Sequence, residues 1–460
     1  MKKGFLWGAV MLLSYTSFAQ TREAQLLDSI LTSEYNKKQF NGNVLVADKG
    51  KVIFEKSYGL ANVETQEKLN TNSIFELASV SKQFTAMAIV LLQKQGKLQY
   101  DEPISKYIPE LIFYPVITIR NLVVHTSGLP DYMELFDQKW DKTKFATNQD
   151  IVNEFAKYKP ALEFMPGEKF EYSNTGYAFL ATIIERTSKQ SFGEYLHANI
   201  FKPLQMKNTF IYRSRYEPKK VNNYAYGYVM DSMANMVLTN TFGKEYYTYF
   251  LDGIVGDGMV NSTIHDLLIW DRALYGNNLV NEKDKELIFG ASKTTDGKEN
   301  KYGFGWIVNT QEKYGKTASH SGGWAGYVTY IERHLDNDKT IIVLQNHSGP
   351  LTKIPSKSIR QVLYSEPFDK VIDSSIAATP EELVKYGGVY ASDSFPMKIT
   401  VFPKGNILYA RATGQNPFPL SAYPKNVFRF APARIELTFI PEENVMIYIQ
   451  GKNNVRFKKE

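Results

Sequence analysis

The four residues from Ser79 to Lys82, Ser-Val-Ser-Lys, constrain this chain more than any other feature of its sequence. A short apolar stretch over 73–80 leads into them, and from Phe84 onward apolar residues recur at helical offsets. This pattern predicts a helix whose N-terminus lies at or beside Ser79, with Lys82 one turn further on and on the same side. An amine would then lie next to a hydroxyl.

That arrangement is typical of nucleophilic catalysis, because a hydroxyl is a poor nucleophile until a neighbouring base takes its proton. A lysine can be the base only if its pKa falls, and partial burial and the positive helix end would both lower the pKa of Lys82. Backbone N–H groups at the same helix end could hold a developing oxyanion. The alternative is a helix cap followed by a surface lysine, a combination that arises by chance in most chains of this length.

The first residues have the pattern of an export signal. Met1 to Lys3 form a basic start, 4–13 form a short apolar core, and Ser17 and Ala19 are small residues at the −3 and −1 positions before Gln20. The apolar run is too short to span a bilayer comfortably, and the lack of cysteine excludes a lipoprotein anchor. We predict a signal peptide over 1–19 and a periplasmic or secreted protein with no membrane anchor after cleavage.

Composition excludes several kinds of chemistry. There is no cysteine, which rules out thiol nucleophiles, disulfides and thiolate metal sites. The net charge of +6 is scattered, and no basic run is interleaved with aromatic residues, so we expect no nucleic-acid partner. The six histidines are dispersed, and zinc-helix and phosphate-loop motifs are absent. We therefore predict no metal and no cofactor, and we interpret His125 as structural.

The sequence pattern predicts an α+β region followed by a separate all-β module. Strands around a turn at 48–50, helices after Asn174 and over 266–275 and 357–364, and a three-strand meander over 302–345 mark the first region. The stretch 213–250 is predicted as loops. We place the first domain at 20–366, a linker at 367–378, and a small barrel of alternating strands at 379–460.

Two further motifs could complete a site with Ser79. In Tyr172-Ser173-Asn174, the tyrosine phenol could relay protons if nearby cations lower its pKa, and the Asn174 amide could hold a substrate carbonyl. The simpler interpretation of this motif is a turn with an N-capping residue.

The second motif, His-Ser-Gly-Gly, begins at His320 near the edge of the predicted meander. Its adjacent glycines permit close approach of a ligand, and the Gly323 N–H could face the Ser79 N–H as a second oxyanion donor. The alternative is a β-bulge.

Together these motifs resemble those of the serine β-lactamase and penicillin-binding-protein family, which includes esterases and D-aminopeptidases. The Ser-x-x-Lys, Tyr-x-Asn and His-x-Gly motifs occur in the family's order, and the segments 125–130 and 256–267 are also similar. The resemblance covers about 35–365. It implies a β-lactamase/transpeptidase-like fold, in which an antiparallel sheet is flanked by helices and joined by an α-helical subdomain. The tail, 383–459, is similar to a lipocalin-like domain.

The resemblance also implies roles for individual residues. These are the nucleophile Ser79, its base partner Lys82, a second acid/base group Tyr172, substrate contacts from Asn174, His320 and Gly322, and an oxyanion hole formed by the N–H groups of Ser79 and Gly323. One departure stands out, because β-lactamases and many penicillin-binding proteins have lysine where this chain has His320. A neutral imidazole attracts a substrate carboxylate less than a permanent cation does.

We therefore expect an exported serine hydrolase that forms an acyl-enzyme and cleaves an ester, peptide or amide, with D-amino-acid and cell-wall-derived substrates as candidates. A D-alanyl-D-alanine carboxypeptidase or weak β-lactamase is the first alternative, and a catalytically silent ligand-binding or sensor protein is the second. The expected partner is a small-molecule or peptide substrate, for which peptidoglycan is one source. The natural substrate, the oligomeric state and the role of the barrel stay open.

Overall fold

The structure is a computed structural model that describes residues 21–368 and 375–460. The predicted signal peptide and the central part of the predicted linker, 369–374, lie outside the described residues. The domain boundaries and the cleavage site therefore stay predictions. Within the described parts of the chain, no helix is both long enough and apolar enough to cross a membrane.

A six-stranded sheet forms the centre of the larger region, and every neighbouring pair of strands in it is antiparallel. The predicted hairpin supplies the last two strands, joined by a turn with Lys49 and Gly50 at positive φ. The strand order is β12 (Ile307–Gln311), β13 (Gly315–Trp324), β14 (Tyr327–His334), β15 (Lys339–Gln345), β1 (Gly42–Asp48) and β2 (Lys51–Tyr58).

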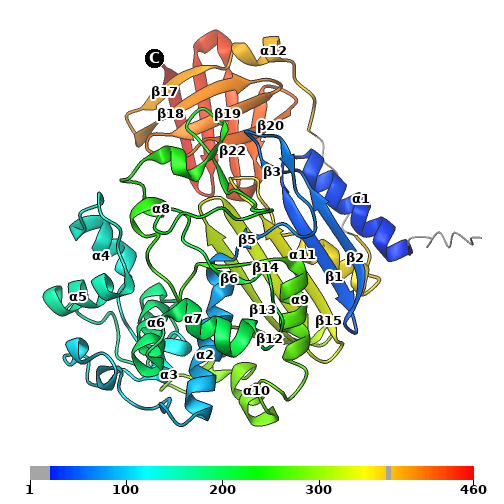
Figure 1. Ribbon diagram of the computed structural model, residues 1–460. Helices are drawn as coiled ribbons and strands as arrows, with labels where there is room; N and C mark the ends of the chain where they lie inside the picture. Colours follow the sequence, from blue (N-terminus) through cyan, green and yellow to red (C-terminus); the bar gives the residue numbers. More distant parts are fainter. Residues whose placement is uncertain (1–20, 369–374) are drawn as a thin grey trace, which may run out of the picture.

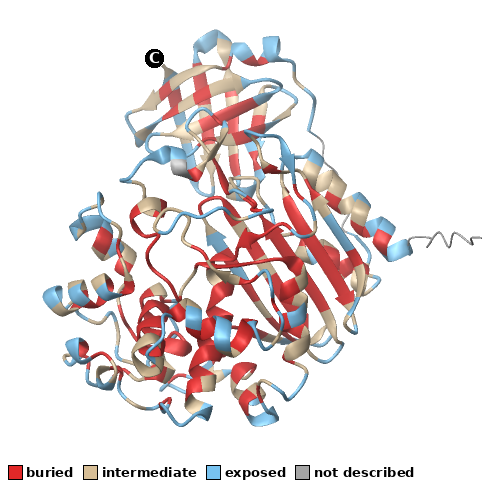
Figure 2. Ribbon diagram, in the orientation of Figure 1, coloured by how far each residue is buried: buried red, intermediate tan, exposed pale blue. Residues whose placement is uncertain are grey.

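Helices cover both faces of this sheet (Figure 1). On one face, α1 (Arg22–Asn36) and α11 (Ser356–Leu363) bury apolar residues against β1, β2 and β15. On the other face, α9 (Ile264–Ala273) lies along β15 and β1, within the large core that also contains α2 (Lys82–Lys94) and α6 (Asn174–Ser188). Figure 2 shows these central strands and helices as the most buried part of the molecule.

The α-helical subdomain surrounds α2 and α6, which pack against each other. Both helices are buried over most of their length, consistent with the apolar pattern from which they were predicted. The other helices of the larger region are α3 (Ile119–Val123), α4 (Tyr132–Lys139), α5 (Asn148–Tyr158), α7 (Phe192–Leu196), α8 (Tyr247–Phe250) and α10 (Glu282–Ile288).

Very short strands connect the six-stranded sheet and the α-helical subdomain. The sheet that matters most for the site runs in the order β5 (Phe75–Glu76), β9 (Val260–Ser262) and β6 (Phe210–Ile211). Another contains β16 (His347–Ser348), β7 (Tyr228–Met230) and β8 (Met236–Leu238). The pairs β3 (Leu60–Asn62) with β4 (Glu67–Lys68) and β10 (Ser292–Lys293) with β11 (Glu299–Asn300) complete the set.

The C-terminal region is a closed eight-stranded antiparallel barrel preceded by α12 (Pro380–Val384), which confirms the predicted all-β module. Its strands are β17 (Gly388–Ser392), β18 (Phe395–Lys404), β19 (Ile407–Ala412), β20 (Phe418–Tyr423), β21 (Val427–Phe430), β22 (Ile435–Ile440), β23 (Val445–Gln450) and β24 (Asn453–Lys459).

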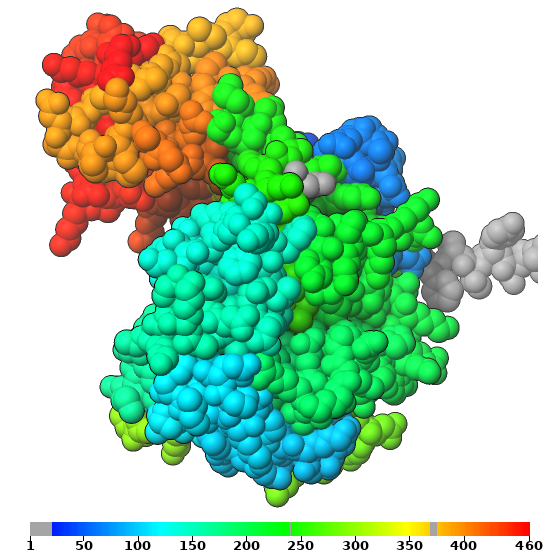
Figure 3. Space-filling view, turned by 60° about the vertical axis from the view of Figure 1, so that its left-hand side comes forward, coloured from blue at the N-terminus to red at the C-terminus, as the bar shows by residue number. Residues whose placement is uncertain are grey.

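The barrel is seated on the turn between β7 and β8, as the space-filling view shows (Figure 3). Lys404 donates to the carbonyl oxygens of Met233 and Ala234, and Arg411 donates to that of Ser232 at 3.0 Å. The predicted loop region 213–250 therefore contains a small hairpin and α8, and part of it supports the barrel.

The fold class agrees with the prediction, with one correction inside the meander. The predicted strand 302–308 overlaps β12 only at its end, and the strand containing His320 was not predicted. Residues 315–324 form β13, a full strand between β12 and β14. Its run of Gly, Ser, His and Thr residues lacks the apolar alternation by which strands are found.

Candidate functional site

Ser79 lies in a short 3₁₀ helix, η1 (Ala78–Ser81), between β5 and α2. Neighbouring strands hold this helix from two sides. The Leu77 N–H donates to the Val260 carbonyl at 2.8 Å, and the Thr329 hydroxyl donates to the Leu77 carbonyl at 2.6 Å. The Ser81 Oγ accepts from the Val260 N–H at 3.1 Å. The Ser79 backbone is thus fixed by β9 and β14, which favours a precisely placed hydroxyl.

The residue before Ser79 has an unusual backbone conformation. Ala78 has a φ of 48°, in the left-handed region that non-glycine residues rarely adopt. Such a conformation costs about 1 kcal/mol, and residues of this kind concentrate at active sites where surrounding structure holds them. Nothing in the local sequence indicates it.

Lys82 is completely buried, which excludes the interpretation of a surface lysine after a helix cap. Its Nζ lies 3.2 Å from Ser79 Oγ, 3.0 Å from Asn174 Oδ1 and 2.8 Å from the Asp257 carbonyl oxygen. The helix therefore brings the amine to the hydroxyl as predicted, and it joins Asn174 from the second motif. The Asp257 carbonyl was not predicted as a partner.

Asn174 is the first residue of α6, and its side chain is oriented from both ends. Its Oδ1 accepts from Lys82, and its Nδ2 lies 3.5 Å from Asp131 Oδ2. Ser173 caps α6 by accepting from the Gly176 N–H at 3.1 Å, so the simpler N-cap interpretation of this motif is also correct.

Tyr172 presents its ring face to the lysine, with Lys82 Nζ 4.9 Å from the ring centroid. The side chain is 40% exposed and lines the cavity described below. Within the described residues its hydroxyl makes no hydrogen bond, so the group is free to meet a substrate. The structure thus brings Tyr172 together with Ser79 and Lys82.

His125 supports the Tyr172 segment from behind. The Ser173 N–H donates to its Nδ1 at 3.0 Å, and the Glu171 N–H donates to its carbonyl oxygen at 2.9 Å. Burial, reinforced by the charge of Lys82, lowers the pKa of His125 well below its usual range. The neutral ring lies 4.3 Å from the Tyr172 ring between centroids, consistent with the structural role predicted for it.

His320 lies in β13 and is also buried. Its Nδ1 lies 2.6 Å from the Ser321 carbonyl oxygen and its Nε2 lies 2.8 Å from the Tyr302 hydroxyl. A carbonyl only accepts, so Nδ1 carries the proton and Nε2 accepts from Tyr302. Burial, together with the charge of Lys82, lowers the pKa of His320 to about 3, so this imidazole is neutral at physiological pH.

Gly322 lets β13 approach the nucleophile. A Cβ at this position would lie 2.3 Å from the Leu77 carbonyl oxygen and 3.1 Å from the Ser79 nitrogen. Any larger residue would therefore push β13 away from η1. Neither His320 nor Gly322 lines the cavity, so the arrangement favours supporting roles for both over the direct substrate contacts predicted from the sequence.

The cavity has a volume of about 560 Å³ and is lined by both Ser79 and Gly323. A Cβ on Gly323 would meet no atom within 4 Å, so open space lies beside it. This placement is compatible with the predicted pair of oxyanion donors. Among the described residues that line the cavity, Glu76 and Asp257 are acidic, and no lysine, arginine or histidine is present.

The two acidic residues of the cavity differ in their surroundings. Asp257 accepts a hydrogen bond from the Tyr132 hydroxyl at 2.9 Å, whereas the Glu76 carboxyl has no hydrogen bond or ion pair among the described residues. Burial, with the nearby charges of Asp252 and Asp257, raises the pKa of Glu76 to about 8, and Arg215 opposes this shift. Sequence reasoning missed Glu76, since a lone acidic residue before the nucleophile carries no distinctive pattern.

The raised pKa predicts a pH-dependent stability. A carboxyl with a higher pKa in the folded protein stabilises the fold fully below its unfolded pKa, near 4.5, and loses that contribution as the pH rises through about 8. At pH 8.5, Glu76→Gln should therefore exceed the wild type in free energy of unfolding by up to about 4 kcal/mol, and it should unfold at a higher temperature. At pH 5 the difference should be much smaller. Thermal unfolding at the two pH values tests this.

The matched control is Glu67→Gln, because Glu67 lies exposed in β4. It should change stability little at either pH. If Glu76→Gln behaved like this control, Glu76 would be ionised and paired in solution.

Comparison with known proteins assigns most of the chain to one family. The family model described as Beta-lactamase matches residues 27–364. The chain belongs to the β-lactamase family. The match includes η1, α6 and β13, and it excludes the barrel. This family consists of β-lactamase-related serine hydrolases.

Similar proteins extend the match beyond the family domain. Penicillin-binding protein 4* of Bacillus subtilis is 37% identical over 418 residues, which cover 88% of this chain and 90% of that protein. The octameric penicillin-binding protein homologue from Pyrococcus abyssi has a TM-score of 0.64 at 24% identity, covering 95% of this chain and all of that one. D-amino acid amidase from Ochrobactrum anthropi has a TM-score of 0.61 at 22% identity, over 75% and 98%. The two structural similarities show the shared fold.

Proposed function

We propose that this β-lactamase-family protein is an exported hydrolase that forms an acyl-enzyme on Ser79 and cleaves an ester or amide bond. The observation that carries the proposal is the 3.2 Å contact between Lys82 Nζ and Ser79 Oγ at a cavity large enough for a small substrate. The sequence of 1–19 is the reason for placing it outside the cytoplasm.

The partners of Lys82 suit a general base. Proton transfer from Ser79 requires the neutral form of Lys82, in which the amine has two N–H donors and one lone pair. The Asn174 Oδ1 and the Asp257 carbonyl only accept, so they take both hydrogens and leave the lone pair facing the Ser79 hydroxyl. If the Asn174 amide were flipped, so that its Nδ2 pointed at Lys82, it would lose its donor contact with Asp131. The surroundings of Lys82 therefore favour the proton transfer that activates Ser79.

In the proposed reaction, Lys82 removes the proton from the Ser79 hydroxyl as its oxygen attacks the substrate carbonyl. The N–H groups of Ser79 and Gly323 stabilise the oxyanion. Tyr172, whose hydroxyl is free at the cavity, passes a proton to the leaving group as the oxyanion collapses and the bond from the carbonyl carbon to the leaving group breaks. The acyl group is then left on Ser79. Water then hydrolyses the acyl-enzyme and returns the proton to the site.

The charges of the site favour substrates without a free carboxylate. No cationic side chain among the described residues lines the cavity, and His320, which stands where many family members have lysine, is buried and neutral. A substrate carboxylate would find no cationic partner for a charge-assisted hydrogen bond in the cavity and would lie beside two acidic residues, Glu76 and Asp257. Esters and D-amino-acid amides fit this site better than penicillins, and the similarity in fold to a D-amino acid amidase is compatible with such substrates.

A comparison of kcat/KM for four substrates tests the proposal. We expect a p-nitrophenyl ester and a D-amino-acid amide to exceed nitrocefin and a D-alanyl-D-alanine peptide by about tenfold or more, the effect of one charge-assisted hydrogen bond. Efficient turnover of the last two substrates would instead support a carboxypeptidase or weak β-lactamase. Failure to turn over any ester or amide, without an acyl adduct, would support a silent binding protein.

A further inference from the structure

Glu76 is an acidic side chain of the cavity wall to which the proposed reaction assigns no role. It is 6% exposed, it lines the same cavity as Ser79, and it has no hydrogen-bond or ion-pair partner among the described residues. Its carboxyl oxygens are not fully buried and reach the cavity, where a ligand could meet them. A carboxyl that has lost most of its contact with solvent gains when a ligand supplies a hydrogen-bond donor. Such a group in a substrate cavity points to a partner supplied by the substrate.

The neighbouring strand lacks a donor as well. Asn261 lies directly opposite Glu76 in the antiparallel pair of β5 and β9, so the two side chains leave the sheet on the same face. The Asn261 Nδ2 donates to the carbonyl oxygens of Tyr212 and Met259, which fixes the amide, and its Oδ1 is buried without a partner. The surroundings of Glu76 therefore contain unpaired acceptors.

Aromatic rings surround the same position. A side pocket of about 110 Å³ adjoins the catalytic cavity and shares Glu76, Trp324 and Tyr327 with it. Tyr224 also lines the side pocket, and its hydroxyl lies 3.2 Å from that of Tyr327. Aromatic faces beside a carboxyl favour an organic cation, because both the ring faces and the carboxyl attract a positive charge. Arg215 lines the side pocket as well, so its own partners bear on the charge of this position.

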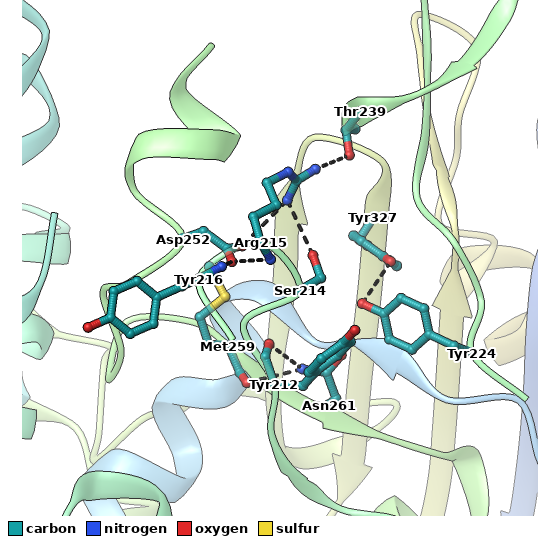
Figure 4. Close-up of polar contacts among 10 residues, drawn as sticks. All are labelled: Tyr212, Ser214, Arg215, Tyr216, Tyr224, Thr239, Asp252, Met259, Asn261 and Tyr327. Atoms are coloured by element: carbon teal, nitrogen blue, oxygen red, sulfur yellow. Dashed lines mark hydrogen bonds and ion pairs between the residues drawn. The ribbon is translucent and has the colours of Figure 1, made fainter. Parts of the chain in front are cut away.

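The nearby arginine is engaged elsewhere. The Arg215 guanidinium donates to Thr239 Oγ1 at 2.6 Å and lies 3.4 Å from Asp252 Oδ1, as Figure 4 shows. Asp252 Oδ2 in turn accepts from the Arg215 and Tyr216 N–H groups at 2.7 and 2.9 Å. Asp252 therefore pairs with Arg215, whose Nε is buried without a partner, and Glu76 forms no ion pair with the guanidinium among the described residues.

We infer that Glu76, with the rings of Trp324 and Tyr327, is a binding subsite for a primary ammonium group of the substrate. The inference rests on the proposed function, since it narrows the substrate of the same site to an amine-bearing ester or amide. An ammonium supplies three N–H donors and a positive charge, which the unpaired carboxyl lacks. Glu76 would act in binding and would take no part in the transfer of the acyl group.

Binding to the Ser79→Ala protein tests this without turnover. The probes are D-phenylalaninamide, which carries an ammonium, and D-3-phenyllactamide, which has a hydroxyl in its place. By isothermal titration calorimetry at pH 7, the first should bind about tenfold more tightly or better, since an interfacial charge pair of this kind is worth that much. In Ser79→Ala/Glu76→Gln the two probes should bind equally, and Glu76→Asp should restore part of the preference.

Glu67→Gln in the same background is the matched control and should keep the preference. Labelling of Glu76→Gln by a fluorophosphonate at Ser79 shows that the variant folds. The inference would be overturned if the Ser79→Ala protein bound the two probes equally or bound neither of them. It would also be overturned if the preference for the ammonium probe survived Glu76→Gln. Failure of the proposed function has a different signature, namely no acylation of the wild type.

Discussion

Replacing Ser79 with alanine should abolish covalent labelling of this protein by a fluorophosphonate and lower p-nitrophenyl ester turnover by about 10⁴-fold or more. The reason is that, among the described residues, Ser79 has the only hydroxyl within hydrogen-bond distance of the Lys82 amine, at 3.2 Å, and Ser79 lines the cavity. Intact-mass spectrometry should find one adduct on the wild type and none on the variant, and peptide mapping should place it on Ser79.

Ser81→Ala is the matched control, because it removes a hydroxyl from the same 3₁₀ helix. The Ser81 Oγ faces away from the chemistry and accepts from the Val260 N–H, so its loss leaves one buried donor unpaired. We expect about 1–3 kcal/mol of lost stability and retained labelling at Ser79. An adduct on any other residue, with Ser79 unmodified, would contradict the assignment of the nucleophile.

The parts of the site that lie on regular elements could be predicted from the sequence. The apolar pattern after Phe84 specifies α2, and a helix places residues three apart on one side, so the contact between Ser79 and Lys82 follows. Similarly, Ser173 at the start of an apolar helical pattern indicated an N-cap, which places Asn174 at the first position of α6.

The parts that depend on short strands could not be predicted. β5 and β9 contain two and three residues, too few for any periodicity, yet their pairing places Glu76 opposite Asn261 and holds Leu77 against Val260. The left-handed backbone of Ala78 and the carbonyl of Asp257 likewise leave no trace in residue type. Main-chain groups of this kind are set by tertiary packing, which propensity does not record.

The role of His320 shows how far motif reasoning extends. Its departure from lysine was visible in the sequence, and it removes a permanent cation from that position. Its burial and its pairing with Tyr302 were not visible, because both depend on β13 being an inner strand of the sheet. The substitution therefore reports on the charge of the site more than on a direct contact with the substrate.

Lys82→Met should lower kcat for ester hydrolysis by about 10²–10⁴-fold, the usual contribution of a general base. Methionine keeps much of the length of the side chain but has no amine, so the Ser79 hydroxyl loses its proton acceptor. The Asn174 Oδ1 and the Asp257 carbonyl would also lose their donor, at about 1–3 kcal/mol of stability. Single-turnover acylation rates and thermal unfolding, measured together, separate the two effects.

Lys94→Met provides the control from the other end of α2, where Lys94 pairs with Asp284 at 3.1 Å, away from the cavity. It should retain wild-type acylation.

Tyr172→Phe completes the comparison, because the Tyr172 hydroxyl makes no hydrogen bond within the described residues and its removal should disturb packing little. If Tyr172 is the second acid/base group, this variant should also lose about 10²–10⁴-fold in kcat while it keeps its unfolding temperature. Near wild-type turnover by Lys82→Met would exclude Lys82 as the base, and the same result for Tyr172→Phe would leave its ring as a wall of the cavity only. A loss of activity that follows unfolding alone would mean that Lys82 holds α2, α6 and the Asp257 segment together without activating Ser79.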